Sequence, residues 1–205
     1  MRNKIPGFYF ILKERLKGNN FLYEFYFKGK KTLDIGCGEG EFLKSDKDLN
    51  YGVDLNKDVV DRLNSEGFNV KLASVDALPY QNNHFDMVHC HNVIEHLNID
   101  VAYKMINESA RVLKKDGLFV LSSEVVTKKF WQTFGHVKPY PPEAILKLLR
   151  KQSREEFEPI SNLEFVGVFY FGDYFQNKLL YLVSVFIAYF TPFFRREYFL
   201  IFKKK

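Results

Sequence analysis

The stretch Thr32–Gly40 (TLDIGCGEG) combines glycines at alternate positions with closely spaced carboxylates. Glycine is needed where a backbone turns sharply or must touch a ligand. The β-prone residues before the first glycine predict a short buried strand. The glycines then predict a tight turn and a helix beginning at Glu41. A glycine-rich strand–turn–helix usually binds a nucleotide-like ligand.

Charge and spacing narrow the choice of ligand. A dinucleotide fingerprint needs a small residue where Glu41 stands, and a P-loop needs a Gly-Lys-Ser/Thr sequence that does not follow here. The carboxylates of Asp34, Glu39 and Glu41 would repel a pyrophosphate. They suit a cationic ligand instead. S-adenosylmethionine (SAM), which carries an ammonium and a sulfonium group, matches this turn.

The same stretch resembles motif I of the class I SAM-dependent methyltransferases, in the type 11 branch of ubiquinone- and menaquinone-biosynthesis-like enzymes. The resemblance covers residues 30–125 firmly and the rest by topology. It implies an α/β, Rossmann-like fold with a seven-stranded, mostly parallel sheet, an antiparallel last strand and helices on both faces. It also implies SAM as cofactor and S-adenosylhomocysteine as product. The cofactor contacts it implies in this stretch are Asp34, Gly36, Cys37 and Gly38.

Two further acids stand where the family contacts SAM. Asp54 ends the expected second strand, 51–54, where a carboxylate can accept hydrogen bonds from both ribose hydroxyls. Asp54-Leu55 matches the family's ribose position, and the alternative is that Asp54 caps the next helix. Asp76-Ala77 follows the third strand and matches the adenine contact: carboxylate to exocyclic amine, backbone N–H to a ring nitrogen. The alternative there is a surface turn.

The region after the fourth expected strand, 84–90, also matches the family, which commonly has Asn-x-hydrophobic-hydrophobic-Glu-His-Leu there. Asn92–Leu97 fits that pattern and is expected to open a helix. The resemblance places His91 beside the cofactor, where the family usually has a small residue. The later elements are expected to be helices at 56–66, 100–114 and 141–152, and strands at 118–122, 163–171 and 197–202. The last of these strands is expected between the fifth and sixth.

Length and composition predict a single domain over residues 1–205 with a sizeable core. The net charge of +5 permits an anionic partner without selecting one. Two cysteines do not suggest a disulfide framework, which favours a reducing, cytoplasmic location, with membrane association left open. Residues 1–31 form an expected helical, aromatic cap. It either packs on the sheet or covers the substrate site.

An apolar insert, 172–196, separates the last two expected strands. Its segment 179–194 carries no charge and is bracketed by Lys178 and Arg195. A helix apolar on every face must be buried in something. It is shorter than a membrane-spanning helix of about 20 residues. The alternatives are its own sheet, a homodimer interface and a membrane surface.

Methyl transfer needs a base only when the acceptor is a hydroxyl or an acidic carbon. His136, on the loop after the fifth strand, is the candidate catalytic residue, with loop packing as the alternative. His96 is expected to hold its helix to a neighbouring loop. No metal is expected, because His89, Cys90, His91 and His96 lack metal-ligand spacing. A reactive Cys90 is not favoured either.

The sequence therefore predicts a SAM-dependent methyltransferase that acts on a small-molecule or lipid-linked acceptor. Two alternatives stay open. One is RNA (tRNA) methylation, although Lys203–Lys205 is the only dense basic run. The other is a non-catalytic SAM-binding partner subunit, for which the apolar insert would be the interface.

Overall fold

The computed structural model describes residues 22–150, 157–172 and 195–205, together with 180, 183–184, 186–187 and 190–191. The described chain mixes helical and extended segments and ends on two strands. The elements are η1 (Tyr23–Phe27), β1 (Thr32–Ile35), η2 (Leu43–Ser45), β2 (Asn50–Asp54), α2 (Lys57–Ser65), β3 (Asn69–Leu72), β4 (Phe85–His91), η3 (Ile94–His96), α3 (Ile99–Val112), β5 (Leu113–Glu124), η4 (Phe130–Gln132), α4 (Pro142–Lys147), β6 (Leu163–Gly172) and β7 (Arg195–Lys204).

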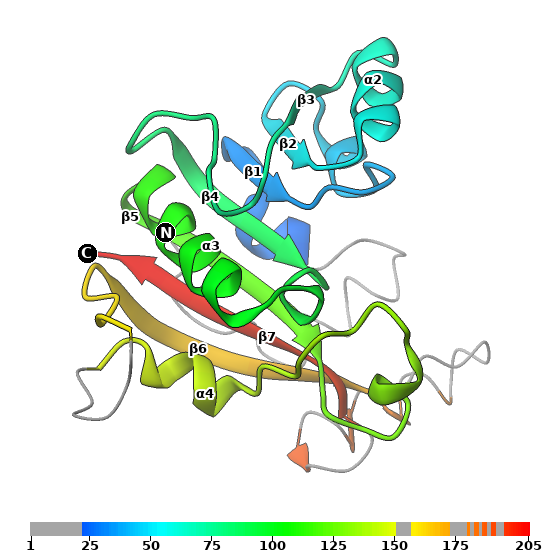
Figure 1. The fold of residues 1–205 in the computed structure, drawn as a ribbon, viewed down its shortest axis with the longest axis vertical. Helices are drawn as coiled ribbons and strands as arrows, with labels where there is room; N and C mark the ends of the chain where they lie inside the picture. Colours follow the sequence, from blue (N-terminus) through cyan, green and yellow to red (C-terminus); the bar gives the residue numbers. More distant parts are fainter. Residues whose placement is uncertain are drawn as a thin grey trace.

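Seven strands form one sheet in the order β3-β2-β1-β4-β5-β7-β6 (Figure 1). The strands from β3 to β5 pair in parallel, whereas β7 runs antiparallel to both β5 and β6. The predicted Rossmann-like sheet with its last strand between the fifth and sixth is confirmed. The strand order reverses between β1 and β4, and open α/β sheets bind ligands beyond the carboxyl ends of the strands at such a point.

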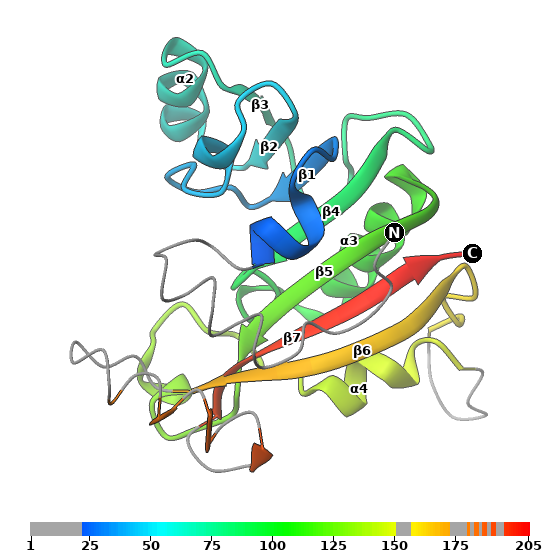
Figure 2. The ribbon, with the colours of Figure 1, turned by 180° about the vertical axis from the view of Figure 1, so that it is seen from behind.

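Different parts of the chain cover the two faces of the sheet. α3 and α4 lie on the near face in Figure 1, and η1 lies on the opposite face, seen in Figure 2. The Asn98 side chain caps α3 by accepting the Val101 N–H at 3.0 Å. The helix then buries Met105, Ile106 and Ala110 against the sheet.

The described part of the leader packs on the sheet. Tyr23, Tyr26 and Phe27 are buried in one cluster with the β5 residue Val120 and the β7 residue Ile201. Of the two alternatives for the leader, packing on the sheet or covering the substrate site, residues 22–27 follow the first. The earlier leader, with its expected helix at 8–17, lies outside the described residues.

α2 begins after Asn56, whose side chain accepts the N–H groups of Asp58 and Val59. Asp54 is therefore not the N-cap of this helix. α2 buries Val60 and Leu63 over the edge of the sheet formed by β2 and β3.

Two predicted helices are replaced by single turns. The helix expected at Glu41 is wrong: η2 is one 3₁₀ turn, because the chain must return to β2 and Asp46 starts a turn by accepting the Asp48 and Leu49 N–H groups. After β4, Asn92 adopts a left-handed conformation (φ 52°), so a helix cannot begin there; η3 follows instead, and α3 starts later.

The observed ends of two further elements differ from the predicted ones. β5 begins at Leu113 rather than 118, and the left-handed Asp116 (φ 65°) bends its first part. α4 ends at Lys147, short of the predicted 152, and residues 151–156 lie outside the description.

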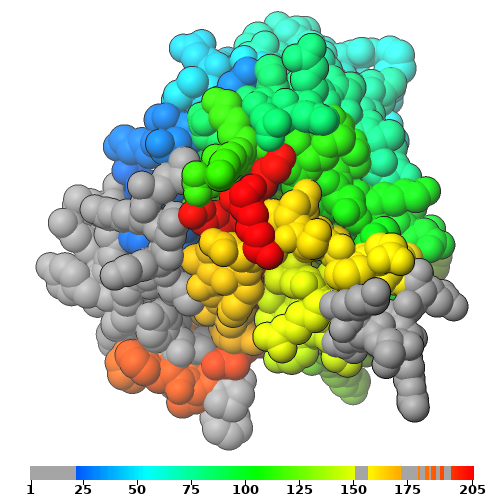
Figure 3. All heavy atoms as spheres, turned by 90° about the vertical axis from the view of Figure 1, so that its left-hand side faces the viewer, coloured from blue at the N-terminus to red at the C-terminus, as the bar shows by residue number. Residues whose placement is uncertain are grey.

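The C-terminal end of β7 lies on the surface between the start of β5 and the start of β6 (Figure 3). Lys203 pairs with Asp116 at 2.7 Å, and Lys204 donates to the Leu113 carbonyl at 2.6 Å and to Asn83 at 2.8 Å. Lys203 and Lys204 of the basic C-terminal run therefore bind the start of β5 and the turn before β4.

Most of the apolar insert, including much of 179–194, lies outside the described residues. The residues described between 180 and 190 are helical, and Val183 among them is half-exposed. Among the helices that the structure describes, none is long and apolar enough to cross a membrane.

Candidate functional site

The glycine-rich turn sits where the strand order reverses. The Gly36 N–H donates to the Val53 carbonyl of β2 at 2.9 Å, which ties the turn to the neighbouring strand. Gly36 has φ +67°, and a Cβ there would lie 2.6 Å from a methyl group of Val93. Only glycine lets the loop after β4 pack this closely. A Cβ on Gly38 would meet nothing within 4 Å, so this side of the turn is open to a ligand.

Asp54 is held beside this turn. Its Oδ2 accepts the Gly38 N–H and its Oδ1 accepts the Asn56 N–H, both at 2.9 Å. Each carboxylate oxygen keeps a further lone pair. The carboxylate is thus fixed at the carboxyl end of β2 with capacity to accept the two ribose hydroxyls, as the sequence predicted. That role stays a prediction.

The residues predicted to surround the rest of the cofactor lie on the next loops. Leu55 is 67% exposed, an apolar surface that an adenine ring could cover. Asp76 accepts a hydrogen bond from Ser74 Oγ. The Ala77 N–H already donates to the Ser74 carbonyl at 3.2 Å, so the predicted bond to the adenine would have to share that donor.

Asp34 is buried on the opposite side of β1 from Leu33 and Ile35. Its Oδ1 lies 2.7 Å from Nδ1 of His89, and the His89 ring stacks on Phe42 at 4.3 Å. Asp34 therefore has a structural partner that sequence reasoning missed. The two residues lie directly opposite each other on neighbouring parallel strands, a register that the sequence alone does not show.

His91 lies at the end of β4, as predicted, but its ring faces β5 and β7. Nδ1 is 2.6 Å from Ser122 Oγ and 3.2 Å from Glu197 Oε1. Loss of hydration, aided by His89, lowers the pKa of His91 to about 4, so the ring is neutral at pH 7. Burial, and next the charge of Glu95, raise the pKa of Glu197 to about 8. A contact from His91 to the cofactor stays a prediction.

Neither cysteine has the environment of a nucleophile. Cys37 follows Gly36 with its side chain buried, and burial together with Asp34 and Asp54 raises the pKa of its thiol to about 12. Cys90 is fully buried, which raises the pKa of its thiol well above the usual range. Both thiols stay protonated at neutral pH.

His136 and His96 meet on the loop side of β4 and β5. His96 Nδ1 bonds the Gly135 carbonyl at 2.8 Å, so His96 does hold its segment to a neighbouring loop. His136 Nδ1 bonds the Phe130 carbonyl at 2.8 Å, and the two rings lie edge to face 5.0 Å apart. Glu95, buried beside them, was not predicted as a site residue. Desolvation raises its pKa, against smaller opposing effects of Ser123 and the two histidines.

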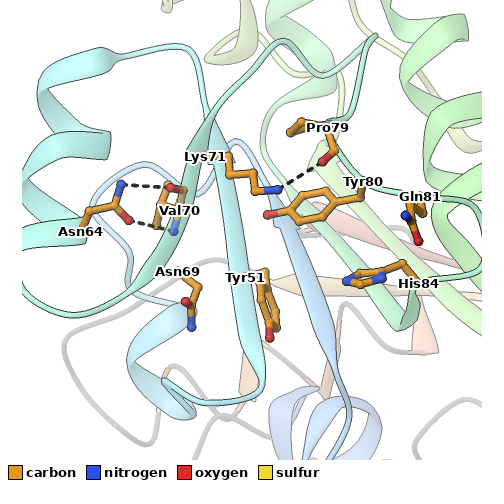
Figure 4. Close-up of a pocket in the computed structure, with 9 residues that line it drawn as sticks. All are labelled: Tyr51, Asn64, Asn69, Val70, Lys71, Pro79, Tyr80, Gln81 and His84. Atoms are coloured by element: carbon orange, nitrogen blue, oxygen red, sulfur yellow. Dashed lines mark hydrogen bonds between the residues drawn. The ribbon is translucent and has the colours of Figure 1, made fainter.

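Two hollows help to locate ligands. One of about 530 Å³, lined by Tyr51, Lys71, Tyr80 and His84 among others, lies at the amino ends of β2 and β4, away from the glycine-rich turn (Figure 4). Another of about 280 Å³ lies by the carboxyl end of β5, between Glu124, Pro141, Arg195 and Tyr198. Parallel strands place ligands at their carboxyl ends, so the smaller hollow is the better candidate for an acceptor.

Comparison with known proteins finds a methyltransferase-domain match over part of this chain. Residues 33–121 match the family model described as "Methyltransferase domain". The chain is 35% identical over 99 residues to the uncharacterized protein MJ0638 of Methanocaldococcus jannaschii, a match covering 46% of this chain and 42% of that protein. It is 32% identical over 101 residues to the uncharacterized methyltransferase YcgJ of Bacillus subtilis, covering 44% and 39%. The chain thus spans less than half the length of these relatives.

The fold is also found in a solved structure. A SAM-dependent methyltransferase from Archaeoglobus fulgidus superposes with a TM-score of 0.64 at 23% identity, covering 97% of this chain and all of that one. At this identity the likeness shows the fold, which is the arrangement of strands and loops described above.

Proposed function

Because residues 33–121 match the methyltransferase-domain family model and the fold is that of a SAM-dependent methyltransferase, we propose that this protein transfers the methyl group of SAM to a small-molecule or lipid-linked acceptor. The observation that carries the proposal is the turn at Gly36–Gly38 with Asp54 bound to it. This turn lies where the strand order reverses between β1 and β4, and SAM-dependent methyltransferases of this fold bind SAM at that place.

The turn and its neighbours offer contacts for several parts of SAM. The Asp54 carboxylate, fixed by the Gly38 and Asn56 amides, can accept hydrogen bonds from the ribose. The open side of Gly38 leaves room for a ligand to approach the backbone. Leu55 supplies an exposed apolar surface for the adenine ring. Methyl transfer from the sulfonium then requires mainly that the acceptor be aligned in line with the methyl carbon and sulfur.

The acceptor side favours an apolar molecule. The connection from β5 to α4 carries exposed apolar side chains beside the end of the sheet: Val126, Trp131, Phe134 and Val137. Phe134 is fully exposed, and several exposed apolar side chains on one connection are what a ligand-binding or interaction surface would carry. The 280 Å³ hollow opens from the same region and is too small for more than part of a large acceptor. This supports a lipid-linked acceptor with its tail outside the protein.

The basic run at the C terminus gives the RNA alternative no support. The dense basic run at the C terminus is engaged: Lys203 pairs with Asp116, Lys204 donates to the Leu113 carbonyl, and Lys205 donates to the Ser161 carbonyl at 2.9 Å. Phosphate recognition needs cations that are free to face the backbone of the nucleic acid.

The test is transfer of label from methyl-labelled SAM to a cell extract, followed by partition of the products. Label in the organic phase supports a lipid-linked acceptor, and label in the aqueous low-molecular-weight fraction supports a small polar one. Label in the RNA or protein pellet would overturn the acceptor class. SAM binding without any incorporation would favour the non-catalytic partner subunit, and then the oligomeric state and the partner would be the next measurements.

A further inference from the structure

Three side chains that can ligate a metal converge at the carboxyl end of the sheet. Glu95 and His96 belong to η3, after β4, and His136 belongs to the connection after β5. One potential ligand atom from each lies within 4.8 Å of the other two. His136 follows His96 by 40 positions in the chain, so the fold and not local sequence brings the two parts of the cluster together.

Each imidazole ring is held through Nδ1 by a backbone carbonyl. His96 Nδ1 lies 2.8 Å from the Gly135 carbonyl, and His136 Nδ1 lies 2.8 Å from the Phe130 carbonyl. A carbonyl only accepts, so each Nδ1 carries a proton, which leaves Nε2 as the nitrogen of each ring that can ligate a metal. Histidine ligands commonly donate their other N–H to a backbone carbonyl in this way.

The carboxylate of Glu95 is incompletely satisfied. The residue is fully buried; Oε2 accepts a hydrogen bond from Ser123 Oγ at 3.0 Å, while Oε1 has no hydrogen-bond partner within the part of the chain that is described. A buried carboxylate oxygen without a partner is costly. A cation bound between Glu95 and the two rings would remove that cost.

The backbone holds the two halves of the cluster in register. The Glu95 carbonyl accepts the Val137 N–H at 2.8 Å and the Lys138 N–H at 3.3 Å. The Tyr140 hydroxyl donates to the Leu97 carbonyl at 3.0 Å. The ring of His96 packs on Gly135, where a Cβ would lie only 3.2 Å from Nδ1. The cluster is therefore positioned before any ion arrives.

We propose that Glu95, His96 and His136 bind one divalent transition-metal ion, with two imidazole nitrogens and one carboxylate oxygen as ligands. This ligand set suits Zn²⁺, Fe²⁺, Co²⁺ or Ni²⁺ better than Mg²⁺ or Ca²⁺, which prefer oxygen. His96 is exposed and His136 is partly exposed, so an ion there keeps open coordination positions toward solvent.

The place of the site suggests what fills the open position. Both segments lie beyond the carboxyl ends of strands, where the proposed methyl transfer takes place (Figure 1). A metal ion lowers the pKa of a coordinated hydroxyl and orients it. The acceptor class that fits is an oxygen nucleophile, a hydroxyl or phenol, and this step alone rests on the proposed function. His136 would then be a ligand and not the general base that the sequence suggested.

The test is direct metal binding by the full chain, in the absence of SAM. After treatment with a chelator and dialysis, the protein is titrated with ZnCl₂ in a calorimeter, and with CoCl₂ while visible absorption is recorded. We expect one ion per chain. Glu95→Gln and His136→Gln keep the size of each side chain and are expected to weaken binding at least 10-fold.

His84→Gln is the matched control, because His84 lies at the other end of β4 beside Lys31. It is expected to bind metal as the wild type does. Thermal unfolding of each variant without metal shows that it is folded. Absence of binding in the folded wild type, or equal binding by Glu95→Gln, His136→Gln and wild type, would overturn the proposal. SAM calorimetry on the metal-free protein tests the proposed function separately.

Discussion

The Gly38 amide donates to the Asp54 carboxylate at 2.9 Å across 16 residues of sequence. The hydrogen bond joins the turn after β1 to the end of β2. It makes the position of the carboxylate depend on the shape of the glycine-rich turn. The glycine-rich turn and Asp54 therefore form a single structural unit, and a substitution in either should weaken the binding of SAM.

Asp54→Asn should weaken SAM binding by about 1–3 kcal/mol, because a charged acceptor for the ribose is replaced by a neutral one. Calorimetry with SAM measures this directly. Asp58→Asn, an exposed acid in the first turn of α2, is the control and should bind SAM normally. Unchanged affinity in Asp54→Asn would remove the ribose assignment.

The buried pair of Asp34 and His89 should contribute to stability. His89→Leu leaves a carboxylate buried and unpaired, so we expect a loss of about 3 kcal/mol in the free energy of unfolding. Denaturant unfolding at pH 7 is the measurement. The double variant Asp34→Leu/His89→Leu removes both polar groups and should recover part of the loss. A single variant as stable as wild type would show that the 2.7 Å contact contributes little.

Some strands could be predicted closely because their signals are local, although β5 begins five residues earlier than predicted. β1 and β6 were expected within one residue of their observed bounds, since alternating or continuous apolar runs are bounded by glycine or charge. The position of β7 between β5 and β6 came from the family resemblance and was correct. The strand bounds thus depend on patterns that neighbouring residues carry, whereas the strand order does not.

The short helices and the polar clusters depend on contacts between distant residues. η2 replaces a helix because Asp46 turns the chain back to β2, and the sequence does not show how little space is available. The pairing of Asp34 with His89 requires the β1–β4 register. Glu95 and His136 are brought together only when the connection after β5 folds back on η3. A single sequence carries no local signal for such contacts.

Glu197 should make stability fall as pH rises. Its folded pKa, about 8, lies above the usual value because burial and Glu95 disfavour the charged form. In the unfolded chain Glu197 releases its proton near pH 4.5, whereas in the folded protein it keeps the proton up to about pH 8. Its contribution to the free energy of unfolding is therefore fully present below pH 4.5 and is lost as the pH rises to 8. We expect this group to lower the free energy of unfolding by at most about 5 kcal/mol over that range.

Glu197→Gln tests this pH dependence, because glutamine imitates the protonated acid. The free energies of unfolding of wild type and variant should converge near pH 5 and separate at pH 8–9, where the variant is the more stable. Glu164→Gln, at an exposed position of β6, is the control and should follow the wild type. A constant difference between wild type and Glu197→Gln at all pH values would contradict the assignment.

Gly36→Ala should destabilise the protein for two separable reasons. The backbone at Gly36 has φ +67°, which any L side chain resists, and the new Cβ would lie 2.6 Å from a Val93 methyl group. Gly67→Ala carries only the first cost, since Gly67 has φ +83° and a Cβ there meets nothing within 4 Å. Gly36→Ala should therefore lose about 1–3 kcal/mol more of the free energy of unfolding than Gly67→Ala, by analogy with overpacking in a core.

Adding Val93→Ala to Gly36→Ala should recover stability and SAM affinity together, because removing the two methyl groups lets the turn return to its place beside Asp54. If the second substitution only lowers stability further, the close packing of Val93 on Gly36 is not what requires glycine there.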